Sequence, residues 1–205
     1  MNPSVDALRA TFGNAIGRAA EVCGDTIVYV APARLADVMR WLHDTPGQQY
    51  DYLVDVTAVE YRDRERPLEV VYQLRALAGG AELRVKVELD LSADLTLDSV
   101  VAVWQGANWL EREVFDMFGV TFRGHPDLRR ILMWETYAEG HPLRKDFPLR
   151  GRFSRAEQVR QALAANPEAH YSLAELSIAD AYAELPPDMK ERLRHGRRGE
   201  VGDTE

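Results

Sequence analysis

The sequence predicts an α+β fold: a two-layer domain with a mainly antiparallel sheet and helices on one face, followed by an extended C-terminal arm. Two helical patterns near the N-terminus are followed by a run of strands with short connections, and this order favours two layers. After residue 122 the chain is rich in Pro and Gly and has little periodicity. We therefore predict a domain over residues 1–122 and an arm over 123–205, with short helices and a frayed C-terminus.

The first elements alternate between helix and strand. Apolar residues at helical spacing predict a helix from Pro3 to Gly13, with Ser4 in position to cap it. The β-rich residues 26–30 predict a short strand. Pro32 opens a second helix, because proline is favoured in the first helical turn. The apolar stripe of that helix is formed by Leu35, Val38, Met39 and Leu42.

Three strands are predicted next, over residues 52–61, 68–77 and 83–89. The last alternates apolar and charged residues, the pattern of a strand buried on one face. The connections at 63–67 and 78–81 are hairpin-sized, so neighbouring strands are expected to run antiparallel.

A third helix is predicted over residues 107–118, ended by Gly119 in the position that favours a left-handed residue. The short strand 120–122 is expected to return to the sheet. In the arm, helices are expected over residues 154–165, capped by Ser154, and from Pro187 to Gly196.

Charge is distributed unevenly along the chain, whose formal net charge is −8. Residues 1–122 carry −8, residues 123–160 carry +4 and residues 161–205 carry −4. A basic segment between acidic ones suggests an acidic partner surface or nucleic acid. No nucleic-acid-binding motif accompanies it, so we favour a protein partner and expect no nucleic acid.

Several function classes are excluded by composition. One cysteine, Cys23, allows no internal disulfide or CxxC pair, and it leaves too few thiolates for an iron–sulfur cluster or a structural zinc site. Nucleotide-binding and hydrolase motifs such as GxGxxG, GxxxxGK[ST] and GxSxG do not occur. No apolar stretch is long enough to cross a membrane and no signal peptide is apparent. We expect no cofactor in this chain and a bacterial cytoplasmic location.

The first candidate site is the acidic cluster on the third helix. Glu113 and Asp116 are three residues apart and share a face, so they could bind a divalent cation or form an acid pair. A solvated helix face with an Arg112–Asp116 pair is the favoured interpretation, because surface carboxylates are common and rarely catalytic.

The second candidate site consists of two His-Pro pairs, His125-Pro126 and His141-Pro142, each between Gly and a later Leu-Arg. Both histidines could bind a metal beside the helix carboxylates. Their spacing is not that of a zinc site, so we favour histidines that hydrogen-bond in proline-stiffened turns.

The third is the basic run Arg144-Lys145-Asp146, with Arg150 and Arg152 behind it. Such a run could contact phosphates or RNA. Docking onto an acidic protein surface explains it as well and suits the acidic remainder of the chain better.

Three blocks of sequence together resemble one known family. The blocks read Asp55-Val56-Thr57-Ala58-Val59-Glu60-Tyr61, then Glu111-Arg112-Glu113-Val114-Phe115-Asp116-Met117-Phe118-Gly119-Val120-x-Phe122-x-Gly124-His125-Pro126-Asp127-Leu128-Arg129-Arg130-Ile131-Leu132, then Gly140-His141-Pro142-Leu143-Arg144-Lys145-Asp146-Phe147-Pro148-Leu149. They are similar to the C-type subunit of NADH-quinone oxidoreductase, the 30 kDa peripheral subunit of respiratory complex I. The resemblance covers about residues 25–149.

The resemblance implies a subunit of a proton-translocating NADH-quinone oxidoreductase, on the cytoplasmic side of the bacterial plasma membrane. Family members hold no flavin or cluster. They pack against the large subunit of D type and the adjacent small iron–sulfur subunit near the quinone pocket, so membrane association is expected only through the complex. The residues expected at the partner interface are Glu111, Arg112, Glu113, Asp116, His125, Pro126, Arg129, His141, Pro142, Arg144, Lys145 and Asp146.

The tail departs from this family. After Leu149 many relatives continue with Gly-Tyr-x-Glu-x-Arg-Tyr, whereas this chain reads Arg150-Gly151-Arg152-Phe153, so contacts of the tail are not carried over. The alternatives are the equivalent subunit of a membrane-bound hydrogenase or of a dehydrogenase fed by ferredoxin, a stand-alone RNA-binding protein, and a metal-dependent enzyme built on the two histidines and two helix carboxylates.

Overall fold

The computed structural model describes residues 2–165 and 187. The chain divides into two compact units, residues 1–153 and 154–205. In the second unit the described part contains α4 (Arg155–Ala165), and the side chain of Ser154 accepts a hydrogen bond from the N–H of Glu157 at 3.3 Å, as a capping residue does. The helix expected from Pro187 lies outside the described residues, apart from Pro187 itself.

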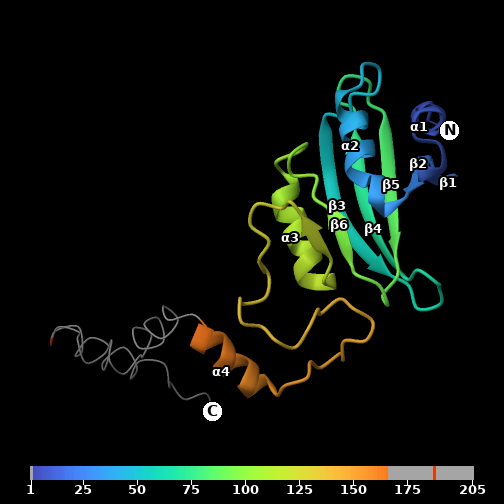
Figure 1. Cartoon of the computed structure of the whole chain (residues 1–205). Coiled ribbons are helices and arrows are strands. Elements are labelled where there is room, and N and C mark those ends of the chain that lie inside the picture. Colours follow the sequence, from blue (N-terminus) through green and yellow to red (C-terminus); the bar gives the residue numbers. More distant parts are fainter. Residues whose placement is uncertain (1, 166–186, 188–205) are drawn as a thin grey trace, which may run out of the picture. The chain divides into compact units, whose positions relative to one another are not determined.

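The first unit contains three α-helices, seven strands and two short 3₁₀ turns in its described part (Figure 1). In chain order these are α1 (Ser4–Phe12), η1 (Gly13–Ala15), β1 (Ile16–Val22), β2 (Asp25–Val30), η2 (Pro32–Arg34), α2 (Leu35–Asp44), β3 (Tyr52–Glu60), β4 (Leu68–Arg75), β5 (Glu82–Leu89), β6 (Thr96–Asp98), α3 (Ala107–Phe118) and β7 (Thr121–Arg123).

Five strands form one sheet in the order β1-β2-β5-β4-β3. Every pair in it is antiparallel except β2 with β5, which are parallel. The predicted α+β fold with a mainly antiparallel sheet is therefore confirmed. The parallel pair arises because the chain crosses over from β2 through α2, β3 and β4 before β5 returns beside β2.

Helices cover one face of this sheet (Figure 1), and the side chains of that face are apolar. Alternate residues of β4 are completely buried in a single cluster with side chains from α1, α2 and α3. The predicted stripe of α2 belongs to the same cluster, as does Leu8 of α1. The opposite face carries polar and charged side chains and is not covered by these three helices; we call it the open face, and its members include Tyr29, Glu69, Gln73, Arg84, Lys86 and Glu88.

Three local expectations are corrected by the structure. The strand after α3 does not join the main sheet, because β7 pairs in parallel with β6 in a separate two-stranded sheet. β1 was not predicted, since its apolar residues do not alternate with polar ones, and it forms as the edge partner of β2 across the turn at Cys23-Gly24. Ser4 does not cap α1: its hydroxyl bonds the Tyr50 hydroxyl at 2.9 Å, while Asn2 accepts from the Ser4 N–H.

Residues 124–153, which we call the extended segment, contain no helix or strand and belong to the same compact unit as the sheet. The compact unit thus continues past residue 122, where the sequence predicted the arm to begin. Among the described residues, no helix is both long enough and apolar enough to span a membrane.

Candidate functional site

The C-terminal half of α3 is where the residues singled out by sequence meet. The helix ends at Gly119, which adopts a left-handed conformation with φ of 80° and donates its N–H to the Phe115 carbonyl. The carbonyls of the last turn have no partner within the helix and need hydrogen-bond donors from elsewhere. The extended segment supplies them.

Each of the three remaining carbonyls at this end receives a donor from the extended segment. The Asp116 carbonyl accepts from Arg130 at 3.2 Å and from the Nδ1 of His141 at 3.0 Å. The Met117 carbonyl accepts from the N–H of Leu143 at 3.1 Å, and the Phe118 carbonyl accepts from Arg144, also at 3.1 Å. Since two of these donors are cationic, they also complement the negative end of the helix dipole.

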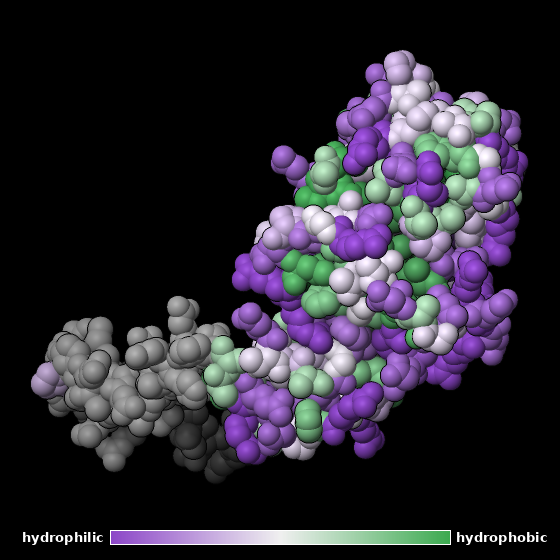
Figure 2. Space-filling model, viewed as in Figure 1, coloured by the Kyte–Doolittle hydropathy of each residue, from purple (hydrophilic) through white to green (hydrophobic). Residues whose placement is uncertain are grey.

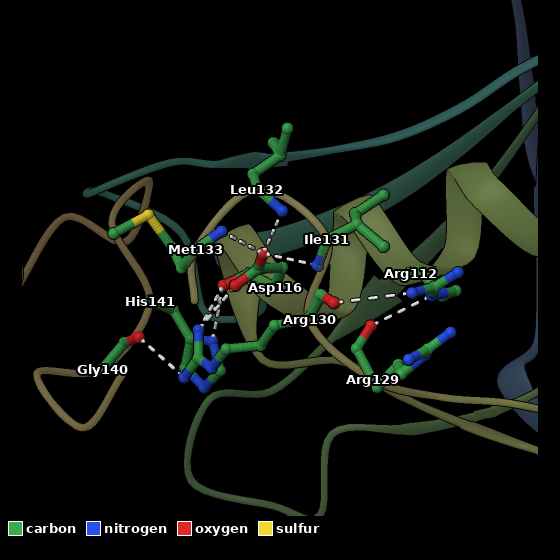
Figure 3. Close-up of polar contacts among 9 residues, drawn as sticks. All are labelled: Arg112, Asp116, Arg129, Arg130, Ile131, Leu132, Met133, Gly140 and His141. Carbon is green, nitrogen blue, oxygen red and sulfur yellow. Dashed lines mark hydrogen bonds and ion pairs between the residues drawn. The ribbon is translucent and has the colours of Figure 1, made fainter. Parts of the chain in front are cut away.

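The carboxylate of Asp116 fixes a second stretch of the extended segment (Figure 3). Its Oδ2 accepts from three consecutive backbone N–H groups, those of Ile131, Leu132 and Met133, at 3.1, 2.8 and 2.9 Å. Its Oδ1 accepts from Arg130 at 2.6 Å. We call this arrangement the Asp116 centre.

The Asp116 centre keeps its carboxylate ionised although the side chain is completely buried. Burial alone would raise its pKa. The N–H of Met133, the Arg130 guanidinium and the two other N–H groups outweigh burial and hold the pKa of Asp116 below its usual value. Arg130 also donates to the Gly140 carbonyl at 3.1 Å, so one guanidinium joins the helix to two parts of the segment.

His141 packs directly on the glycine that ends the helix. A Cβ atom placed on Gly119 would lie 2.6 Å from both Cδ2 and Nε2 of the His141 ring. Because a carbonyl oxygen can only accept, the hydrogen bond to Asp116 places a hydrogen on Nδ1 of His141. Gly119 is therefore required twice, for its positive φ and for the space that the imidazole occupies.

Arg112 holds the first part of the extended segment from the side of the helix. It is buried, and its Nε donates to the Arg129 carbonyl at 3.1 Å, with Nη2 3.5 Å from the Arg130 carbonyl. The guanidinium lies over the ring of Trp109, 5.0 Å from its centroid. The predicted Arg112–Asp116 pair does not form, because Arg130 takes that place.

Glu60, at the end of β3, binds the extended segment near Arg144 and Lys145. Its carboxylate accepts from the backbone N–H of Lys145 at 2.9 Å and lies 3.4 Å from Nε of Arg144. Arg144 is also 3.6 Å from Asp146, whose side chain is exposed. The Lys145 side chain is exposed as well.

Glu111 is the other buried carboxylate of α3. It accepts from the Ser99 hydroxyl at 2.6 Å and from the N–H of Val100 at 2.7 Å, and both of these donors are neutral. Burial is the main cause that raises the pKa of Glu111 to about 7, against the two hydrogen bonds, which lower it. Burial, followed by the charge of Glu111, also raises the pKa of Tyr72.

The remaining predicted residues lie outside the Asp116 centre. His125 donates from Nε2 to the Asn108 carbonyl at 3.1 Å and accepts the N–H of Asp127 on Nδ1, so it joins the start of α3 to the start of the segment. The side chain of Arg129 pairs with Asp127. Pro126 and Glu113 are exposed and Pro142 is half-buried.

A metal-dependent enzyme would need Glu113, Asp116, His125 and His141 close together. The structure does not bring these four side chains together. Asp116 is taken up by donors of its own chain, Glu113 faces solvent, and His125 and His141 hydrogen-bond to different turns of α3. Across residues 2–165, no group of three or more His, Cys, Asp or Glu side chains is placed to hold a metal ion.

Sequence reasoning missed Arg130 and Glu60 as members of this site. Both stand inside the blocks that carry the family resemblance, but neither lies in a pattern that marks an ion pair in advance. Arg130 is separated from Asp116 by a turn, a strand and a loop, so only the folded chain places them together.

The chain matches a family model over residues 28–153, described as "Respiratory-chain NADH dehydrogenase, 30 Kd subunit". It is 46% identical over 145 residues to the C-type subunit of NADH-quinone oxidoreductase from Roseiflexus sp. (strain RS-1), covering 71% of this chain and 82% of that one. It is 44% identical over 151 residues to the protein of the same name from Geobacter sulfurreducens, covering 73% and 91%.

Two solved structures share the fold. One is a trypsin-resistant fragment (1–134) of Nqo5, with a TM-score of 0.52 and 29% identity, covering 61% of this chain and 96% of the fragment. The other is a chain of the membrane-bound sulfane sulfur reductase, an archaeal respiratory membrane complex, with a TM-score of 0.58 and 21% identity, covering 77% and 88%.

Proposed function

Because this chain belongs to the family of the 30 kDa subunit of respiratory-chain NADH dehydrogenase, we propose that it is a non-catalytic docking subunit of a proton-translocating NADH-quinone oxidoreductase. In this proposal it holds no flavin, cluster or metal, and it stabilises the large subunit of D type and the adjacent small iron–sulfur subunit near the quinone site. It reaches the cytoplasmic side of the membrane through these partners.

One observation carries the proposal: the polar residues of the family signature are used within the chain to fix the extended segment. Arg112, Asp116, His141 and Arg144 are buried or half-buried and bond the chain's own backbone. A catalytic group must instead reach a substrate. Their proposed part in the interface is therefore to shape the surface that meets the partner.

Exposed apolar side chains on α3 and the extended segment are available to a partner, beside exposed charged ones such as Lys145 and Asp146. Trp109 of α3 is 64% exposed, and the extended segment exposes Leu132, Leu143 and Leu149. Figure 2 shows hydrophobic areas between hydrophilic ones on this part of the surface. Aromatic and aliphatic groups beside buried charges resemble the composition of protein interfaces.

The test is assembly of the complex from cells in which this chain carries an affinity tag. We expect the tagged chain to retain the two partner subunits together with NADH-binding subunits. Leu132→Asp should lower the yield of assembled complex severalfold, because a carboxylate would enter an apolar contact. Leu77→Asp is the matched control, since Leu77 is 61% exposed and Leu132 is 60% exposed, and Leu77 lies in the β4–β5 turn.

Full assembly of the Leu132→Asp chain would contradict this interface. A purified chain with NADH-quinone reductase activity, a flavin absorption band or a stoichiometric metal would contradict the non-catalytic role.

A second candidate is the equivalent subunit of a related membrane complex, because the same fold occurs in a chain of the sulfane sulfur reductase complex. The tagged chain distinguishes the two candidates. Retention of partner subunits without any NADH-binding subunit would favour the second one.

A further inference from the structure

The open face of the sheet carries a group of arginines that the proposed function does not use. Arg18 comes from β1, while Arg64 and Arg66 come from the β3–β4 hairpin loop. Together with Glu65 and Glu88 they line a cavity of about 590 Å³. The helices and the extended segment described above contact the other face or α3.

A buried carboxylate, that of Glu69, contacts two arginines of the cavity and Lys86. Glu69 of β4 is completely buried although it belongs to the open face. It accepts from Lys86 at 2.7 Å, forms an ion pair with Arg64 and lies 3.9 Å from Arg18. Burial alone would raise the pKa of Glu69; the hydrogen bond and charge of Lys86 and the charge of Arg64 hold it below the usual value.

Two aromatic rings hold the guanidiniums in place. Arg18 lies over the ring of Tyr29, 3.8 Å from its centroid, and Arg64 lies over Tyr61 at 3.6 Å. The β1–β2 pairing also shifts register between Ile16 and Ala19, beside Arg18, and bulges of this kind redirect side chains. Stacked guanidiniums lose less side-chain entropy when they bind a carboxylate.

Arg66 is the third arginine that lines the cavity. Its side chain is exposed and makes no hydrogen bond or ion pair with any residue in the described part of the chain. It also lines a neighbouring cavity of about 190 Å³, where it is joined by Glu88 and by small residues such as Gly17, Ala31 and Pro32. The two cavities share Arg66 and Glu88 and are therefore neighbours, one lined by arginines and the other mainly by small residues; we call the pair the groove.

We propose that this groove binds an acidic, extended peptide segment of a partner protein, with carboxylates on Arg18, Arg64 and Arg66. The lining holds three arginines and two glutamates, a net charge of +1 in a chain that is acidic as a whole. Arg18 already donates to Glu88 at 2.6 Å and Arg64 pairs with Glu69, so Arg66 is the arginine of the lining without an ion pair among the described residues. A single phosphate would lie against Glu65 and Glu88 and would fill little of the cavity. A peptide can place one carboxylate on Arg66 and others on the N–H groups of Arg18 and Arg64 that Glu88 and Glu69 do not use, and it can turn a backbone N–H group towards Glu65.

The test uses the full-length chain and a labelled ten-residue peptide of alternating glutamate and alanine, with binding measured by fluorescence anisotropy. We expect saturable binding that weakens with added salt, and no binding of the same peptide with glutamine in place of glutamate. Arg66→Glu should weaken binding about tenfold. Arg40→Glu on α2 is the matched control and should leave binding unchanged, because Arg40 is exposed and α2 covers the apolar face.

Unchanged thermal melting of Arg66→Glu would show that the variant folds. Equal binding by Arg66→Glu and the parent chain would overturn the proposal. So would displacement of the peptide by inorganic phosphate at matched ionic strength, which would indicate a simple oxyanion site, or equal binding of single-stranded DNA, which would indicate general attraction of polyanions. The assay needs no complex, so its failure leaves the assembly test of the proposed function unaffected.

Discussion

The two halves of α3 each use a completely buried carboxylate to fasten a loop, and they do so with opposite electrostatics. Glu111, in the first half, holds the loop at Ser99 and Val100 with two neutral donors. Asp116, in the second half, holds residues 131–133 with three N–H groups and a guanidinium.

Both side chains are inaccessible to solvent, but Glu111 lies deeper in the protein and only Asp116 has a cationic donor. The pKa of Glu111 rises to about 7 because two hydrogen bonds do not replace lost hydration, whereas the pKa of Asp116 is lowered because its donors include a cation. The difference teaches that the second half of α3 is built around a permanent charge and the first half around a group that titrates near neutral pH.

The largest expected loss of stability follows from removing the ionised carboxylate of Asp116. Asp116→Ala should lower the free energy of unfolding by about 3–5 kcal/mol, because it leaves the Arg130 charge and three N–H groups without their partner. Urea denaturation at pH 7 measures this loss. A loss below about 1 kcal/mol would mean that water replaces the carboxylate and that Asp116 and Glu111 differ less than their contacts indicate.

The next effect is the pH dependence of Glu111. A carboxyl whose folded-state pKa is raised stabilises the fold below its unfolded-state pKa, near 4.5, and that stability is lost as pH rises through about 7. The parent chain should therefore lose about 3 kcal/mol more than Glu111→Gln between pH 4.5 and 8. Denaturation curves of both chains at several pH values give this difference, and parallel curves would contradict a raised pKa.

A smaller effect is expected where the helix ends. Gly119→Ala should cost about 2 kcal/mol, because alanine disfavours positive φ and its Cβ would displace His141 from the helix terminus. Thermal unfolding measures the loss. Gly124→Ala is the control for backbone strain alone, since Gly124 also has φ of 80° but has open space at its Cβ position. Equal losses in the two variants would show that the contact with His141 contributes nothing.

The smallest effect is expected at the third carboxylate of the helix. Glu113 is exposed and has no partner among residues 2–165, so Glu113→Gln should change the free energy of unfolding by less than about 0.5 kcal/mol. The same denaturation assay measures it. If Glu113→Gln lowered the free energy of unfolding as much as Asp116→Ala does, Glu113 would have to form a stabilising interaction with a group outside residues 2–165.

The sequence alone determined much of this protein because local patterns report local structure. The alternation of β5 and the stripe of α2 predicted which side chains are buried, and Gly119 marked the end of α3 correctly. The quoted motifs identified the family, since they keep order and spacing over a long stretch.

Only the tertiary structure decided how the signature residues are used. Glu111, Glu113 and Asp116 look alike on one short helix, yet burial raises the pKa of Glu111 to about 7, Glu113 faces water and Asp116 pairs with Arg130. A helical wheel cannot separate them, because each environment is set by a segment that returns from elsewhere in the chain. The strand pairing of β7 with β6 and the grouping of Arg18 with Arg64 and Arg66 depend in the same way on contacts between distant residues.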